Sequence, residues 1–299
     1  MKWIHFGVLA LAFSAACSDS KPVFDPATMD RPLVPGPAAT LWEGSFESQG
    51  ERLNAIAYEA RGPGPHPTVI LLHGFPGNEK NLDLAQTFRR AGWNVIFFHY
   101  RGAWGSGGSF SFSGALEDVM AVTDAISQPE WARAHRVDRG RIALVGHSMG
   151  GFLALAATSL SPEIHCVVSI AGPDLTGLIP PDASPAAIEQ TGERFQKWAQ
   201  GRLVGATGPA LMSDLIKHRA ALSLAELAPG LNHKPVLLLA GLSDRVVPLE
   251  VIQALYENYR KAGNPDIELI TMEGDHSFSE QRIELAQIVT TFLDRRCRD

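Results

Sequence analysis

Short hydrophobic runs alternate with longer amphipathic stretches along most of the chain. Residues 41–47 and 52–59 alternate between apolar and polar positions around a Gln49-Gly50 turn, which predicts a hairpin. Continuous apolar runs predict buried strands; they are TVILLHG, NVIFFHY, residues 142–145, HCVVSIAG, KPVLLLAG and IELITM. Helical patterns lie between them, over residues 79–90, 115–127, 152–160, 251–261 and 281–296. This order predicts an α/β fold, a mostly parallel sheet with helices on both faces.

One serine stands at the junction of a predicted strand and a predicted helix. The apolar run through Val145 ends at Gly-His-Ser-Met-Gly-Gly, which places Ser148 between Gly146 and Gly150. A serine in so tight a turn is held in strained backbone geometry that lifts its hydroxyl clear of the sheet. The flanking positions require glycine because side chains there would collide. Ser148 is therefore a candidate nucleophile, and the alternative is a serine that only caps the helix.

Two further polar residues directly follow predicted strands. Asp244 lies in LLLAGLSDRVVP and His276 lies in LITMEGDHSF. Ligands of open parallel sheets bind beyond the carboxyl ends of the strands, so both residues belong at that edge. The chain order Ser148, Asp244, His276 is that of the α/β-hydrolase triad. Asp275 is a competing acid, but a direct neighbour cannot readily reach the far nitrogen of the His276 ring, and we prefer Asp244.

Four motifs spread over the domain carry a resemblance to a known family. With HGFPG, GHSMGG, GLSDRVVP and GDHSF, the sequence from about Leu41 onward resembles α/β-hydrolase-fold serine hydrolases. YRGAWGSGG and VDRGRIALVGHSMGG add a likeness to bacterial carboxylesterase-like proteins and to prolyl-oligopeptidase-like catalytic domains. The resemblance implies that the backbone N–H groups of Phe75 and Met149 form an oxyanion hole. It implies neither a metal nor an organic cofactor.

Several other residues near these motifs have less specific readings. We expect His73 to order its loop, His99 to support core or loop, and His147 to point away across the turn as a structural or pocket-lining residue. Trp104 is equally compatible with lining an acyl pocket and with packing. Residues 173–231 predict a helical cap insertion with helices over 186–201 and 211–227. Apolar cap residues either face the substrate or only pack the cap; they are Leu178, Phe195, Trp198 and Leu211.

Composition excludes some classes of protein. The chain has 299 residues, of which 45% are hydrophobic and 19% charged, with a net charge of −6. It contains no basic run and no repeat of solenoid or propeller length, so nucleic acid is not an expected partner.

The N-terminus has the layout of an export signal. Residues 1–16 combine Lys2, an apolar stretch and small residues, and are too short to span a membrane. The segment ending at Cys17 resembles a bacterial lipobox, although Ser14 stands where leucine is usual. We therefore predict a signal peptide over 1–16, lipidation of Cys17 and a flexible tether over 17–40 that precedes the domain at 41–299. The expected location is the cell envelope, by lipid anchor, with a periplasmic or secreted protein as the alternative.

Two cysteines remain besides Cys17. Cys166 begins a predicted strand and Cys297 ends the closing helix, which places both at the sheet edge opposite the candidate site. An oxidising compartment permits a disulfide between them. The other reading, one buried thiol and one frayed terminal cysteine, is the one we favour from sequence.

The pattern as a whole predicts a serine hydrolase that cleaves a carboxylic ester or similar small acyl substrate. A peptidase acting on short peptides is the main alternative. Epoxide hydrolases and dehalogenases share HGFP but use aspartate at the position of Ser148. A non-catalytic binding module is a third reading, which an intact triad argues against.

Overall fold

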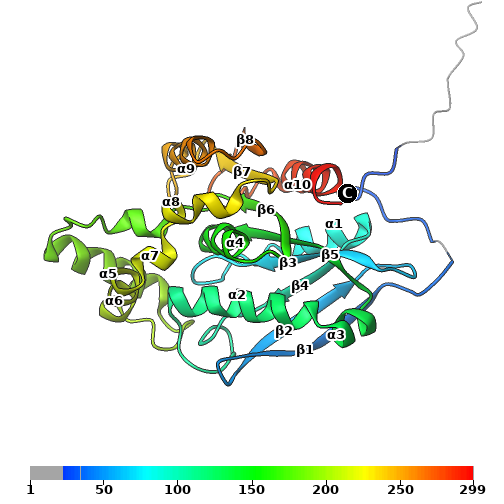
Figure 1. The fold of residues 1–299 in the computed structure, drawn as a ribbon, viewed down its shortest axis with the longest axis horizontal. Helices are drawn as coiled ribbons and strands as arrows, with labels where there is room; N and C mark the ends of the chain where they lie inside the picture. The colour runs from blue at the N-terminus through cyan, green and yellow to red at the C-terminus, as the bar shows by residue number, and fades with distance from the viewer. Residues whose placement is uncertain (1–22, 34, 299) are drawn as a thin grey trace, which may run out of the picture.

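The computed structural model describes residues 23–33 and 35–298. The predicted signal peptide and the predicted lipidation site Cys17 lie outside these residues. An eight-stranded sheet in the order β1-β2-β4-β3-β5-β6-β7-β8 forms the centre of the molecule (Figure 1). Only the pairs β1–β2 and β2–β4 are antiparallel. The strands are β1 (Thr40–Ser48), β2 (Glu51–Glu59), β3 (His66–Leu72), β4 (Asn94–Phe98), β5 (Val137–His147), β6 (Ile164–Ile170), β7 (Val236–Gly241) and β8 (Ile267–Met272).

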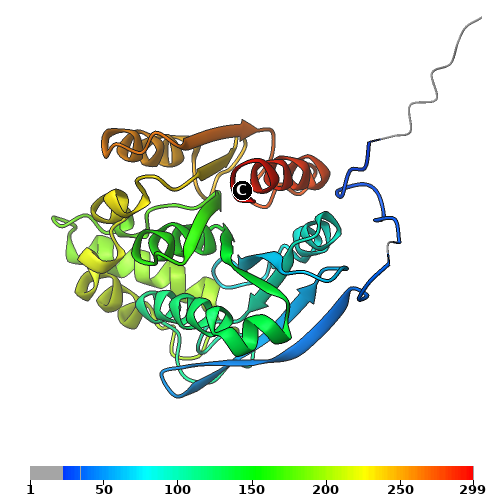
Figure 2. The same ribbon diagram turned by 45° about the vertical axis from the view of Figure 1, so that its right-hand side comes forward.

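The two faces of the sheet bury separate hydrophobic cores. On β3, Ile70 and Leu72 belong to one core while Val69 and Leu71 belong to the other, because successive side chains point to opposite faces. The first core contains residues of α2 (Phe112–Ser127), α4 (Met149–Leu160) and α9 (Leu249–Lys261). The second contains residues of α1 (Leu82–Ala91) and α10 (Arg282–Arg296), which lie side by side (Figure 2). The predicted α/β fold class is confirmed. A short helix, α3 (Pro129–Ala134), follows α2.

The segment between β6 and β7 is helical, as expected, but more broken than the sequence predicted. It contains η1 (Leu175–Leu178), α5 (Pro185–Ala199), α6 (Gly208–Lys217), α7 (Arg219–Leu222), α8 (Leu224–Leu227) and η2 (Ala228–Leu231). The single helix expected over residues 211–227 is wrong. Ser223 adopts an extended conformation and its hydroxyl accepts the backbone N–H of Glu226, so a new helix starts there. We call residues 173–231 the cap segment.

Part of the segment before the domain lies against it. The Arg90 side chain of α1 donates to the Pro26 carbonyl at 2.6 Å, and Gln287 of α10 donates to Asp25 at 2.7 Å. The described residues of the predicted tether therefore include a stretch that contacts two helices. In the part of the chain that the structure describes, no helix is long and apolar enough to cross a membrane.

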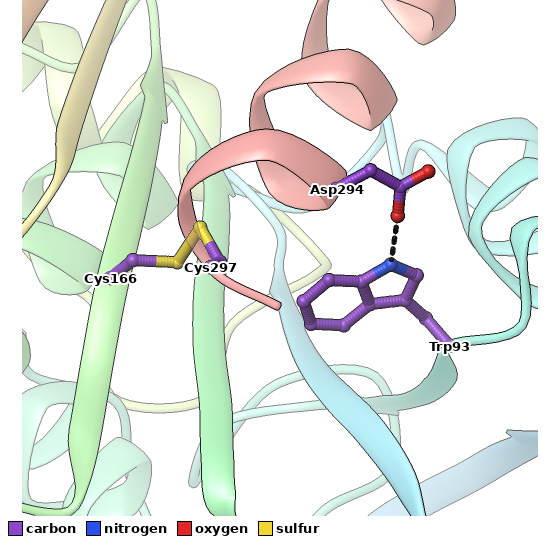
Figure 3. Close-up of a disulfide and its surroundings, with 4 residues drawn as sticks. All are labelled: Trp93, Cys166, Asp294 and Cys297. Atoms are coloured by element: carbon purple, nitrogen blue, oxygen red, sulfur yellow. Dashed lines mark hydrogen bonds between the residues drawn. A yellow bond between two sulfur atoms is a disulfide. The ribbon is translucent and has the colours of Figure 1, made fainter. Parts of the chain in front are cut away.

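A disulfide joins Cys166 of β6 to Cys297, the residue that follows α10 (Figure 3). Their Cα atoms lie 5.7 Å apart, so the unbridged reading favoured from sequence is wrong. Helix α10 runs back along the sheet and ends where β6 begins, and both cysteines are buried. Nearby, the Trp93 indole donates to Asp294 at 2.9 Å, which gives the last turn of α10 a second attachment (Figure 3).

Removing the disulfide should lower stability without abolishing activity. The bridge closes a loop of 131 residues, and loss of such a bridge costs about 2 to 5 kcal/mol of the free energy of unfolding. Urea unfolding of Cys297→Ser beside the wild type, each with and without reductant, measures the effect. Reductant should destabilise the wild type and leave the variant unchanged. Equal stability of oxidised and fully reduced wild type would contradict the assignment.

Candidate active site

Ser148 occupies the tight turn between β5 and α4. Its backbone has φ 56° and ψ −124°, a conformation that non-glycine residues rarely adopt, and α4 starts at the next residue. A Cβ atom on Gly146 would lie 2.0 Å from the carbonyl oxygen of Gly150, and one on Gly150 would lie 2.2 Å from that of Leu72. Both positions therefore require glycine, as the sequence predicted. The turn holds the hydroxyl at the N-terminal end of α4, where free N–H groups favour negative charge.

His276 and Asp244 are brought together by the loops after β8 and β7. His276 Nδ1 lies 2.7 Å from Asp244 Oδ2, while Asp244 Oδ1 accepts the backbone N–H groups of Val246 and Val247 at 2.7 and 2.9 Å. Burial by itself raises the pKa of Asp244, but the hydrogen bonds from His276 and from the two N–H groups outweigh it and lower the pKa below its ordinary value. Asp244 is thus an ionised acceptor that keeps the proton of neutral His276 on Nδ1, leaving Nε2 as a base.

The competing acid, Asp275, has a different set of partners. Its side chain is exposed and accepts the backbone N–H groups of Ser277 and Ser279, at 3.1 and 2.9 Å, and the Ser279 hydroxyl at 2.8 Å. The backbone hydrogen bond from Ser279 and then its hydroxyl lower the pKa of Asp275. Asp275 therefore orders the loop that carries His276 and makes no hydrogen bond to its ring.

Ser148 and His276 line the same cavity, with a volume of about 930 Å³. No hydrogen bond joins the Ser148 hydroxyl to the His276 ring in this ligand-free structure, although such contacts often tighten only around a substrate. The predicted donors Phe75 and Met149 line the cavity too, and neither backbone N–H donates a hydrogen bond within residues 23–33 and 35–298. A Cβ on Gly74 would touch Ser148 Cβ at 3.0 Å, so the loop of Phe75 packs directly against the serine turn.

The loop of Phe75 is held by a chain of hydrogen bonds through two histidines. His73 Nδ1 donates to the Gly74 carbonyl at 2.8 Å, so its Nε2 accepts the proton of His99 Nδ1 at 3.2 Å. Burial lowers the pKa of His73 to about 4 and that of His99 to about 3, which keeps both rings neutral. Trp104 stacks on His99 and donates to the Pro76 carbonyl, so it packs beside this loop and does not line the cavity.

His147 has a contact that the sequence did not reveal. We expected it to point away across the turn, yet its Nε2 donates to the backbone carbonyl of His276 at 2.7 Å and the two ring centroids lie 4.8 Å apart. His147 is buried, and burial is the main cause that lowers its pKa to about 4. A neutral His147 therefore links the serine turn to the loop that carries His276, across 129 positions of the chain.

The cap segment supplies one wall of the cavity. Leu178, Phe195 and Trp198 line it, as the sequence suggested, whereas Leu211 is buried elsewhere in the core. The opposite wall comes from the loop after β7 and from α9, including Val246, Val247 and Val251. A mostly apolar cleft with a few convergent polar groups is typical of small-molecule sites. Among the described residues, no group of three or more His, Cys, Asp or Glu side chains could hold a metal ion.

The buried neutral histidines predict an acid-sensitive fold. Histidine has an ordinary pKa of 6.5, and the pKa values of His73 and His147 are about 4 in the folded protein. Their contribution is fully present above pH 6.5 and is lost as the pH falls toward 4, because only the unfolded chain takes up these protons. We expect the free energy of unfolding to drop by several kcal/mol over that range. Urea unfolding at stepped pH measures it, and His147→Gln should show a shallower dependence; a flat profile would contradict the burial argument.

Comparison with known proteins assigns the family. A model of the alpha/beta hydrolase fold matches residues 67–232, more than half of the chain, and the chain belongs to this family. The chain is 37% identical over 107 residues to an uncharacterized 31.7 kDa protein of Escherichia coli, covering 35% of this chain and 36% of that one. It is 28% identical to the uncharacterized protein YfhR of Salmonella typhi over 70% of this chain and 64% of the relative. These matches thus span from about a third to less than two thirds of the relatives' own lengths.

Solved structures share the fold. An esterase of Pyrococcus furiosus superposes with a TM-score of 0.63 at 22% identity, covering 90% of this chain and 98% of the esterase. The acylaminoacyl peptidase of Pyrococcus horikoshii gives a TM-score of 0.66 at 17% identity, over 88% of this chain and 42% of the peptidase. The predicted recognition is confirmed at the level of the fold family, and the family with its esterase and peptidase neighbours supports hydrolase activity.

Proposed function

We propose that this protein is a serine hydrolase that cleaves carboxylic esters or similar small acyl substrates. The observation that carries the proposal is the 2.7 Å contact of His276 with an ionised, buried Asp244, in a cavity that the elbow serine Ser148 also lines. Apolar side chains from the cap segment and from the α9 wall suit an acyl chain. We further propose export to the cell envelope with Cys17 lipidated, as the N-terminal sequence predicts.

The proposed reaction runs through an acyl-enzyme. His276 Nε2 takes the Ser148 hydroxyl proton as the serine oxygen attacks the substrate carbonyl. The tetrahedral oxyanion accepts hydrogen bonds from the N–H groups of Phe75 and Met149. Collapse breaks the bond to the leaving group, which receives the proton from His276. Water then repeats the cycle on the acyl-enzyme and releases the acid, while Asp244 stabilises the imidazolium in both halves.

A peptidase acting on short peptides is the second candidate, because the same groups cleave amides and the fold is shared with an acylaminoacyl peptidase. A panel of 4-nitrophenyl esters of increasing chain length, beside aminoacyl and prolyl anilides, separates the two. The proposal expects ester turnover to exceed anilide turnover in kcat/KM. Efficient anilide cleavage would favour the peptidase, and no turnover of either class would contradict both.

The His147 contact predicts a positioning role for that side chain. Replacing it with leucine removes the donor to the His276 carbonyl and should lower kcat by roughly 10- to 100-fold with little change in KM, since small misplacements of a catalytic group are costly. Glutamine places an N–H near the position of Nε2, so His147→Gln should recover much of the loss. A leucine variant that is folded and fully active would rule out the role.

A further inference from the structure

The wall of the cavity formed by the cap segment carries three cationic side chains. Arg194 and Lys197 lie on α5 and Arg202 lies in the turn after it, and all three line the cavity that contains Ser148 and His276. They are the lysine and arginine residues of the lining, and they come from nine consecutive positions of an acidic protein with a net charge of −6. We call Arg194, Lys197 and Arg202 the cationic wall.

None of these three cations has an acidic partner among the described residues. Arg194 lies over the Trp198 ring at 5.7 Å, and Arg202 contacts only the backbone carbonyls of Trp198 and Gln200. Elsewhere on the domain exposed or half-buried arginines are paired with carboxylates, as in Arg282 with Asp83 and Arg295 with Glu268. The cationic wall is thus available to an anion that enters the cavity.

The two acidic residues of the lining lie on other elements. Asp174 caps η1, and its Oδ1 accepts the backbone N–H and the hydroxyl of Thr176 at 2.9 and 2.7 Å. Glu250 lies in the first turn of α9, where a negative charge suits the helix dipole. Neither forms an ion pair with the cationic wall, so the charge of the cavity is divided, with its positive side on the cap segment.

We propose that the substrate is an amphiphilic organic anion: an ester with an apolar portion and a carboxylate or similar compact anionic group that the cationic wall binds. This inference rests on the proposed esterase function and adds the substrate class. The apolar portion contacts side chains such as Phe195 and Val247, and the arginines offer forked N–H donors to the anion. Because the wall is exposed, each charge pair contributes modestly and is weakened by salt.

Matched pairs of esters test the charge preference. Mono-4-nitrophenyl suberate and 4-nitrophenyl octanoate place the charge on the acyl arm or remove it; 4-acetoxybenzoate and its methyl ester do so on the leaving-group arm. The variant Arg194→Gln/Lys197→Gln/Arg202→Gln is compared with Arg133→Gln/Arg139→Gln/Lys261→Gln, which removes three exposed cations that do not line the cavity. For at least one pair, the anionic-to-neutral ratio of kcat/KM should fall about tenfold in the first variant only, and should fall with added salt in the wild type.

An unchanged ratio in both pairs, with ester turnover intact, would overturn the inference and leave the proposed function standing. If no ester is turned over, the proposed function fails and binding tests the inference alone. Octyl sulfate and octanol are titrated into Ser148→Ala, with and without the three cationic-wall substitutions, by calorimetry. The inference expects octyl sulfate to bind more tightly than octanol and to lose that advantage when the wall is neutralised; equal binding of the two would overturn it.

Discussion

Ser148→Ala is expected to lower ester turnover by on the order of 10⁴-fold or more while the domain stays folded. Loss of a triad nucleophile removes the acyl-enzyme route, and the residual rate comes from the oxyanion hole and binding alone. Alanine keeps the small side chain that the turn at φ 56° accommodates, so the thermal midpoint should change little. Steady-state kinetics with 4-nitrophenyl esters, beside a melting curve, measures both. Activity close to that of the wild type would remove Ser148 from the mechanism.

Asp244→Asn is expected to be nearly as damaging, with a loss on the order of 10⁴-fold in kcat. The asparagine NH₂ group would donate to His276 Nδ1, which moves the ring proton to Nε2 and leaves no base facing the serine. The backbone N–H groups of Val246 and Val247 can still bond to the asparagine oxygen, so the loop should keep its shape.

Asp275→Asn is the matched control for this substitution. It changes a neighbouring acid whose partners are the N–H groups of Ser277 and Ser279, which asparagine can also accept, and we expect a small effect. Comparison of kcat for the two variants identifies the acid. A severe loss in the Asp275 variant and a mild one in the Asp244 variant would reverse the assignment.

The fold was predictable because its signals are local and strong. Apolar runs such as the one ending at Leu72 mark strands buried on both faces, and alternation around Gln49 marks the single hairpin. The elbow was equally readable, because the glycines at 146 and 150 answer a steric demand that the structure shows directly. The fold family then placed Asp244 and His276 at one edge of the sheet.

The contacts that the sequence did not predict depend on how distant segments meet. His147 bonds to the backbone carbonyl of His276, and a carbonyl has no sequence signature. The disulfide required the end of α10 to reach the start of β6 within bonding distance, which periodicity cannot decide. The break at Ser223 arose because a hydroxyl that is tolerated within a helix also caps one, and packing selected the cap.

Covalent labelling of the nucleophile tests the central claim most directly. The protein is treated with a fluorophosphonate, digested and mapped by mass spectrometry, beside the Ser148→Ala variant. The account predicts one adduct, on Ser148, at a rate that falls sharply in His276→Ala because the serine loses its base. A protein that stays unlabelled, or that carries the adduct on another residue, would contradict it.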